Sequence, residues 1–141
     1  MTDAKQMRLW SLLAKVRRLR VERKRRRLNE VRLEAQRATA ESVRQREAIG
    51  QHEARRTEIL AAYPTANRAA PLWRMALHRH DSSRFALEEA LRSALHTERL
   101  AEARVAAASR ALRREMLGEE DACTRVRRIK AAQHQDEGPD D

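Results

Sequence analysis

The sequence is poor in the residues that build turns and β-sheets. Aromatic residues make up 3% of its 141 positions, and it contains only 3 glycines and 3 prolines. β-Sandwiches and α/β domains need many more turn-forming and aromatic residues, so this composition excludes both classes. We therefore expect an all-α protein that consists of a single domain.

Cysteine is scarce too, because the chain contains 1, Cys123. A single thiol cannot form an intrachain disulfide, and without a nearby Cys/His pattern it predicts no structural zinc site. Long apolar runs are missing as well. The patch at residues 9–14 is shorter than a signal-peptide core and much shorter than a membrane span. These features predict a cytoplasmic protein with neither a cleaved signal nor a membrane helix.

The residues that dominate the chain are alanine, leucine, arginine and glutamate, which all favour helices. Hydrophobic residues make up 41% and charged residues 37% of the sequence. Alanine is the commonest apolar residue, which suits a narrow seam between two helices better than a wide core. The composition thus predicts long helices paired into a rod.

Prolines divide the chain into two halves. No proline lies between residues 4 and 62, which predicts a first helix of about residues 4–62. Pro64 and Pro71 predict a turn over residues 63–71, since proline lacks a backbone donor and pushes the residue before it out of the helical region. A second helix is predicted over about residues 72–134. The acidic residues 135–141 are expected to form a disordered tail.

An alternative start exists within the second helix. Residues 81–83 read Asp-Ser-Ser, and such side chains can cap the first amides of a helix. In that alternative, residues 72–80 form a separate short helix.

Apolar residues recur at spacings of three and four in both predicted helices, as in a coiled-coil seam. In the first helix this seam shifts phase once, and its members are Leu9, Leu12, Val16 and Leu19, then Val21, Leu28, Val31, Ala35, Ala38, Ser42, Ile49, Ile59 and Tyr63. In the second helix its members are Leu87, Leu91, Ala94, Ala101, Val105, Ala108, Leu112, Ala122, Val126 and Ile129. We predict an antiparallel coiled-coil hairpin in which Val21 lies near Leu112.

Several polar side chains occupy core-type positions of this seam. They are Lys24, Gln45, His52 and Arg56 in the first helix and Glu98, Glu115 and Glu119 in the second. Opposite charges on the two helices can pair across a narrow seam while their aliphatic stems cover apolar surface.

Positive charge is concentrated near the start of the chain. The net charge is +10, and residues 1–62 hold 17 Lys and Arg against 8 Asp and Glu. Nine of the thirteen residues from 15 to 27 are basic, namely Lys15, Arg17, Arg18, Arg20, Arg23, Lys24, Arg25, Arg26 and Arg27. A solvated face, with stems packed over residues 106–108, explains part of this run. Its density of like charge favours a surface that binds an acidic partner.

Larger apolar residues gather around the predicted turn. They are Tyr63, Leu72, Trp73, Met75 and Leu77, with Phe85 further along. One interpretation is that they close the end of the hairpin against Ile59 and Leu60. The other is that they form an exposed contact site, because two slender helices leave little to cover them.

No arrangement in the sequence predicts catalysis, a cofactor or a metal. Cys123, Ser82 and Ser83 lack a base and an orienting residue. His78 and His80 are two residues apart and face away from each other on a helix, and His52, His96 and His134 are expected to lie far from them. We therefore expect a protein that is not an enzyme and has no small-molecule substrate.

The pattern as a whole resembles the FliJ/YscO family of type III secretion and flagellar export. The features that carry the resemblance are the length, the basic first helix, the turn marked by prolines, the alanine-rich seams and the acidic tail. The opening, in which Leu9, Leu12, Leu13, Val16 and Leu19 precede the arginine-rich run, is the most family-like part. The resemblance covers nearly the whole chain.

The resemblance implies a stalk or adaptor at the inner-membrane export apparatus. The paired chain ends are implied to contact the hexameric export ATPase through residues 15–27 together with Arg125, Arg127 and Arg128. The opposite end is implied to contact the export gate protein through Leu72, Trp73 and Met75. Secretion chaperones are further implied partners, and the location is cytoplasmic and peripheral to the inner membrane.

The sequence is also compatible with two other classes of protein. The first is a basic coiled coil that binds nucleic acid, although no base-reading motif or stacking aromatic residue accompanies the cations. The second is a generic oligomerising scaffold. A hairpin that is isolated from its partners is expected to be a monomer.

Overall fold

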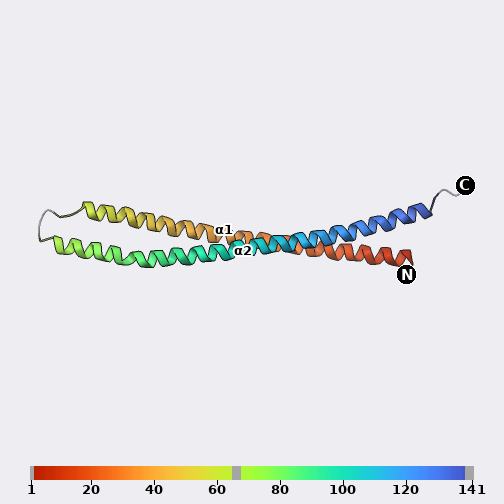
Figure 1. The fold of residues 1–141 in the computed structure, drawn as a ribbon, viewed down its shortest axis with the longest axis horizontal. Helices are drawn as coiled ribbons and strands as arrows, with labels where there is room; N and C mark the ends of the chain where they lie inside the picture. The colour runs from red at the N-terminus through yellow and green to blue at the C-terminus, as the bar shows by residue number, and fades with distance from the viewer. Residues whose placement is uncertain (1, 65–67, 139–141) are drawn as a thin grey trace. The chain divides into compact units, whose positions relative to one another are not determined.

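The computed structural model describes residues 2–64 and 68–138, and within them the chain forms two long α-helices that pack against each other (Figure 1). Helix α1 spans Asp3–Ala61 and helix α2 spans Ala70–Asp136. These residues contain no strand. The predicted all-α class with two long helices is confirmed.

The helix ends lie where the prolines require them. Helix α1 ends at Ala61, and Pro64 follows shortly after it. Pro71 occupies the first turn of α2, where a missing N–H costs nothing. Residues 65–67 of the predicted turn and residues 139–141 of the predicted tail lie outside the described residues. Helix α2 extends to Asp136, into the stretch for which disorder was predicted.

Helix α2 is continuous through residues 81–83, so the alternative of a new helix start there is wrong. The serine side chains do not cap amides. The hydroxyl of Ser82 donates a hydrogen bond to the carbonyl of His78 at 2.7 Å, and that of Ser83 donates to the carbonyl of His80 at 2.7 Å. Such bonds to the preceding turn leave the helical backbone intact.

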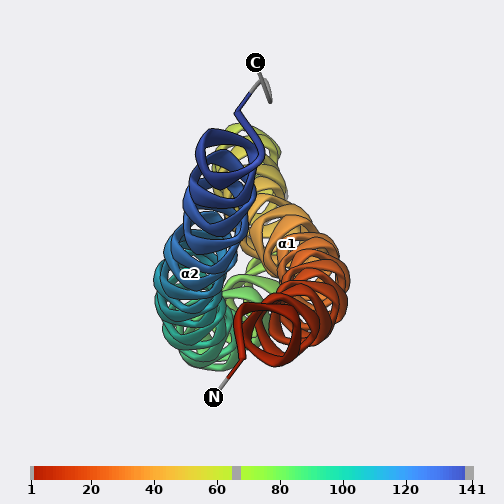
Figure 2. The same cartoon turned by 90° about the vertical axis from the view of Figure 1, so that its right-hand side faces the viewer.

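The chain divides into two compact units, and each unit contains one segment of α1 and one segment of α2. Unit 1 comprises Met1–Arg32 and Ala103–Asp141, and unit 2 comprises Leu33–Glu102. Figure 2 shows that, within the described residues, each helix has only the other helix as a neighbour. Each helix therefore buries one narrow face.

The buried face repeats at spacings of three and four residues. In unit 1 it includes Val21, Leu28 and Val31, which are at most 5% exposed, and Ala122, which is 1% exposed. In unit 2 it includes Ala38, Ser42, Ala94 and Ala101. Small residues dominate this seam, so the helices come close together while burying little apolar area.

The predicted seam is wrong at the start of α1. Leu9, Leu12, Val16 and Leu19 are 53%, 60%, 37% and 59% exposed, and Trp10 is half-buried instead. A step from Leu19 to Val21 rotates the position by about 200° around an α-helix. An uninterrupted helix cannot present both phases to one partner. The phase set by Val21, Leu28 and Val31 continues to the N-terminal end.

Most polar residues expected in the seam do lie there. Lys24, Gln45, His52, Glu98, Glu115 and Glu119 are half-buried. Arg56 is the exception, because its side chain is 44% exposed and reaches around the seam to Asp81.

Neither helix offers a stretch of the described residues that is apolar and uncharged over the length needed to cross a bilayer.

Candidate partner-binding surfaces

The nine basic residues between positions 15 and 27, here called the basic cluster, all lie on α1 in unit 1. Arg17 and Lys24 are half-buried at the seam, and the other seven are exposed. Successive residues on a helix are separated by about 100°, so an uninterrupted run of cations is distributed over the whole circumference. The cluster consequently combines seam-facing and solvent-facing cations.

Two members of the basic cluster form ion pairs with glutamates of α2. Arg17 lies 3.8 Å from Glu115, and Arg18 lies 3.6 Å from Glu119. The guanidinium of Arg17 lies over Gly118, where a Cβ atom would approach its Nη1 to 3.1 Å. The missing side chain of Gly118 gives Arg17 room to lie along α2.

Most of the cluster forms no ion pair in the described chain. Arg27 pairs with Glu30 at 3.4 Å. In residues 2–64 and 68–138, no ion pair forms at Lys15, Arg20, Arg23, Lys24, Arg25 or Arg26. Like charges at this density repel one another, and an acidic partner would relieve that repulsion.

The structure brings only part of the predicted ATPase-contact set together. Arg125 packs over the ring of Trp10, with 4.4 Å between its Cζ atom and the ring centroid, and pairs with Asp121 at 3.5 Å. Lys15, Arg18 and Arg127 line one hollow of about 320 Å³ in unit 1. Arg128 is exposed.

The remaining cations of the cluster lie away from the end of α2. Arg18 already pairs with Glu119, and residues 23–27 lie further along α1, away from its start. Arg125, Arg127 and Arg128 are displaced in the other direction, beyond Glu119 on α2. The residues predicted as one surface therefore form two neighbouring groups within unit 1.

The three residues predicted at the opposite end have different environments. Leu72 is 70% exposed and Met75 is 54% exposed. Trp73 is half-buried, and its Nε1 donates a hydrogen bond to the carbonyl of Ile59 at 2.6 Å. Its ring also meets that of Tyr63 edge-on, with 4.9 Å between the centroids. Trp73 thus packs against the end of α1, whereas Leu72 and Met75 remain available.

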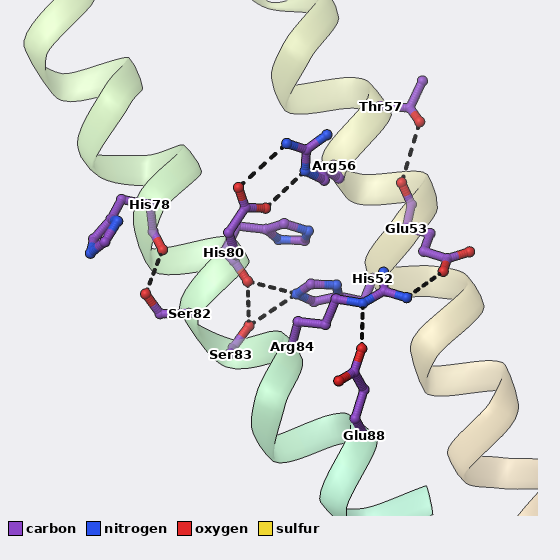
Figure 3. Close-up of polar contacts among 11 residues, drawn as sticks. His52, Glu53, Arg56, Thr57, His78, His80, Ser82, Ser83, Arg84 and Glu88 are labelled. Carbon is purple, nitrogen blue, oxygen red and sulfur yellow. Dashed lines mark hydrogen bonds and ion pairs between the residues drawn. The ribbon is translucent and has the colours of Figure 1, made fainter.

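A histidine pair in unit 2 corrects the expectation that His52 lies far from His80. Their rings stack with 3.7 Å between centroids and an interplanar angle of 10° (Figure 3). His52 Nε2 also donates to the carbonyl of His80 at 2.7 Å and lies 3.0 Å from the hydroxyl of Ser83. His78 points away from both rings. The sequence could have predicted this contact, because the chain reversal that places Val21 near Leu112 also places His52 near residue 81.

Charged pairs flank the histidine stack. The guanidinium of Arg56 donates to both carboxylate oxygens of Asp81, at 2.8 and 3.4 Å. Arg84 bridges Glu88 at 2.8 Å and Glu53 at 2.9 Å. The hydrogen bond from Arg56 lowers the pKa of Asp81, and the same bond raises the pKa of Arg56. These contacts connect α1 to α2 at their polar rim.

Asp81→Asn is expected to lower the melting temperature at neutral pH and to have no effect in acid. The lowered pKa means that the folded chain favours ionised Asp81, so its contribution exists above the ordinary value of 3.8 and is lost as the pH falls below it. Thermal melts of both proteins across this range test the expectation. Arg56→Gln should match Asp81→Asn at neutral pH, and the double variant should lose no more than either one. Additive losses would contradict a direct Arg56–Asp81 pair.

Among the residues that the structure describes, no group of three or more His, Cys, Asp or Glu side chains is arranged to hold a metal ion. Comparisons with protein-family models, curated proteins and solved structures found no match to this chain. The surfaces of the two helices are therefore the features that bear on function.

Proposed function

We infer that α1 and α2 form an antiparallel coiled-coil hairpin. The spacing of three and four along both buried faces supports this fold. So does the pairing within each unit, since Arg17 meets Glu115 in unit 1 and Arg56 meets Asp81 in unit 2. Arg17 near the start of α1 meets Glu115 late in α2, whereas Arg56 near the end of α1 meets Asp81 early in α2. Contacts that run in opposite order along the two helices are what an antiparallel pair requires.

On this fold, the protein is a non-enzymatic stalk or adaptor of a type III secretion export apparatus, as in the FliJ/YscO family that its sequence resembles. The main observation in support is that most exposed cations of the basic cluster form no ion pair within the described residues, so that they offer a binding surface to an acidic partner. In this role the partner is the hexameric export ATPase. The protein acts in the cytoplasm, peripheral to the inner membrane.

The other contact of the stalk is the export gate protein, through the apolar residues at the start of α2. Leu72 and Met75 are the contact residues that the exposure favours. Trp73 stabilises this surface through its hydrogen bond to the carbonyl of Ile59. Secretion chaperones are additional partners in this proposal.

A charged surface suits a stalk that moves within a ring. Exposed ion pairs are individually weak and are screened by salt, so many of them can form and break without locking the stalk in one position. An apolar surface of equal area would hold one orientation more firmly. The basic cluster is expected to face acidic side chains of the ATPase.

Reversing three charges of the basic cluster tests this proposal. The triple variant Arg23→Glu, Arg25→Glu and Arg26→Glu should reduce stimulation of the export ATPase by about tenfold or more and should block secretion, because three attractive contacts become repulsive. ATP hydrolysis by the purified ATPase and secretion by complemented cells are the measurements.

A matched triple variant controls for net charge. Arg37, Arg46 and Arg55 are exposed cations on α1 in unit 2, and their replacement by Glu changes the net charge equally. This variant should keep the stimulation. Equal loss of ATPase stimulation in the two variants, or no loss in either of them, would reject the basic cluster as the ATPase contact.

The alternative function is nucleic acid binding by the same exposed cations. Each neutralised phosphate releases counterions, so affinity would fall steeply as salt rises. Gel shifts with random DNA and RNA at two salt concentrations separate the two functions. Binding that the Arg23, Arg25 and Arg26 reversals abolish, without any effect on the ATPase, favours the nucleic-acid alternative.

A further inference from the structure

Four apolar side chains form an exposed line along the start of α1. This outer stripe consists of Leu9, Leu12, Val16 and Leu19, which are between 37% and 60% exposed. Its members are separated by three, four and three residues, which is the spacing of a coiled-coil seam. The stripe is therefore a second helical seam on a helix that already has one.

The outer stripe lies on the side of α1 that faces away from α2. Trp10 contacts Arg125 of α2, and Val21 is buried against α2. Leu12 follows Trp10 by two residues and Leu19 precedes Val21 by two residues, so each lies about 200° around the helix from the buried side. Within the described residues no other element covers this side (Figure 2). The stripe thus has no intramolecular partner in unit 1.

The stripe is too narrow to suit a lipid surface. Helices that lie in a membrane interface expose a broad apolar face, whereas a coiled-coil seam is only two positions wide per heptad. Three of the five positions that flank the stripe, Arg8, Lys15 and Arg20, are exposed cations, while the other two are the half-buried Leu13 and the exposed Glu22. Lys5 and Arg23 continue the same line at its two ends. Cations consequently occupy most of the positions around the apolar strip.

We propose that the outer stripe is the docking site for one amphipathic helix of a partner protein, whose apolar seam is flanked by Asp and Glu. The spacing of the stripe matches a helical partner, and Arg8, Lys15 and Arg20 occupy the flanking positions that select partners by charge. None of these three cations forms an ion pair within the described chain. A second copy of this chain would place cations against cations, so it does not fit.

This inference goes beyond the stalk proposal, because it concerns an apolar surface of α1 and holds for whichever protein carries the acidic helix. It predicts a three-helix assembly in which α1 contributes one seam to α2 and the other seam to the partner. Its test needs no ATPase, so its failure is distinguishable from failure of the stalk proposal.

A designed peptide provides the probe. A synthetic helix of about 28 residues carries Leu at its seam positions and Glu at all flanking positions, so that it does not pair with itself. We expect fluorescence anisotropy to show that it binds the full chain. Leu12→Glu combined with Leu19→Glu should weaken binding by about tenfold or more, since it places two carboxylates within the apolar seam.

Two controls define the site. Val43 is a 45% exposed valine of α1 outside the register of the stripe, and Val43→Glu should leave the affinity within about twofold. A peptide with Lys in place of Glu at every flanking position should not bind. Circular dichroism confirms that all variants remain helical, which is expected because the replaced side chains are exposed.

Three results would overturn the proposal. The first is equal binding of the Glu and Lys peptides, and the second is equal weakening by Val43→Glu. The third is binding of the chain to vesicles of anionic lipid, abolished by the Leu12 and Leu19 replacements, without any binding of the acidic peptide. That result would assign the stripe to a membrane surface.

Discussion

Replacing Val31 by aspartate is expected to lower the free energy of unfolding by about 3–5 kcal/mol, because it buries a carboxylate without a partner. Val31 is 1% exposed and is the largest side chain among the described residues with less than 2% of its surface exposed. A seam rich in alanine buries little other apolar area, so it has little reserve of stability. We expect that α1 and α2 of the variant are largely unpaired at about body temperature.

Urea and thermal unfolding followed by circular dichroism measure this loss. Leu33→Asp is the matched control, since Leu33 is two residues away on α1 and 54% exposed. It introduces the same carboxylate into the same helix but should cost only about 0.5 kcal/mol, mainly through helix propensity. Similar losses in the two variants would show that Val31 does not face a buried seam.

Replacing Trp73 by alanine is expected to cost about 2 kcal/mol, because the indole is half-buried and bonds to the backbone. Its Nε1 donates to the carbonyl of Ile59, which lies in the last turn of α1. The last carbonyls of a helix have no partner within the helix, so an outside donor stabilises its end. The ring also loses its edge-on contact with Tyr63.

Two further variants separate the parts of this effect. Trp73→Phe keeps an aromatic ring but removes the donor, and should cost about 1 kcal/mol. Leu72→Ala removes a side chain that is 70% exposed, so it should be nearly neutral. Amide hydrogen exchange should accelerate around Ile59 in the Trp73 variants alone. Unchanged exchange there would contradict the role of Trp73 in holding the end of α1.

The result for Trp73 also bears on the contact site that we propose at the start of α2. A partner that bound Trp73 itself would have to break its bond to Ile59. A partner that bound Leu72 and Met75 would meet exposed side chains on a supported surface. Measuring stability and partner binding for Leu72→Ala and Trp73→Ala therefore distinguishes a residue that contacts the partner from one that stabilises the contact surface.

Much of the molecule could be predicted from local sequence. The scarcity of glycine and proline and the abundance of Ala, Leu, Arg and Glu determine that the chain is helical. Pro64 and Pro71 determine where one helix ends and the next begins, because the effect of proline on the backbone acts on its immediate neighbours. The position of the basic cluster on α1 follows from the same local information.

The tertiary structure decided which residues meet. The start of α1 carries two apolar phases, Leu9–Leu19 and Trp10–Val21, and nothing local states which of them pairs with α2. The phase continuous with Leu28 and Val31 is the buried one, since a single helix keeps one face toward its partner along its length. The contacts of His52 with His80 and of Trp73 with Ile59 also join residues distant in sequence, and only packing of the two helices brings them together.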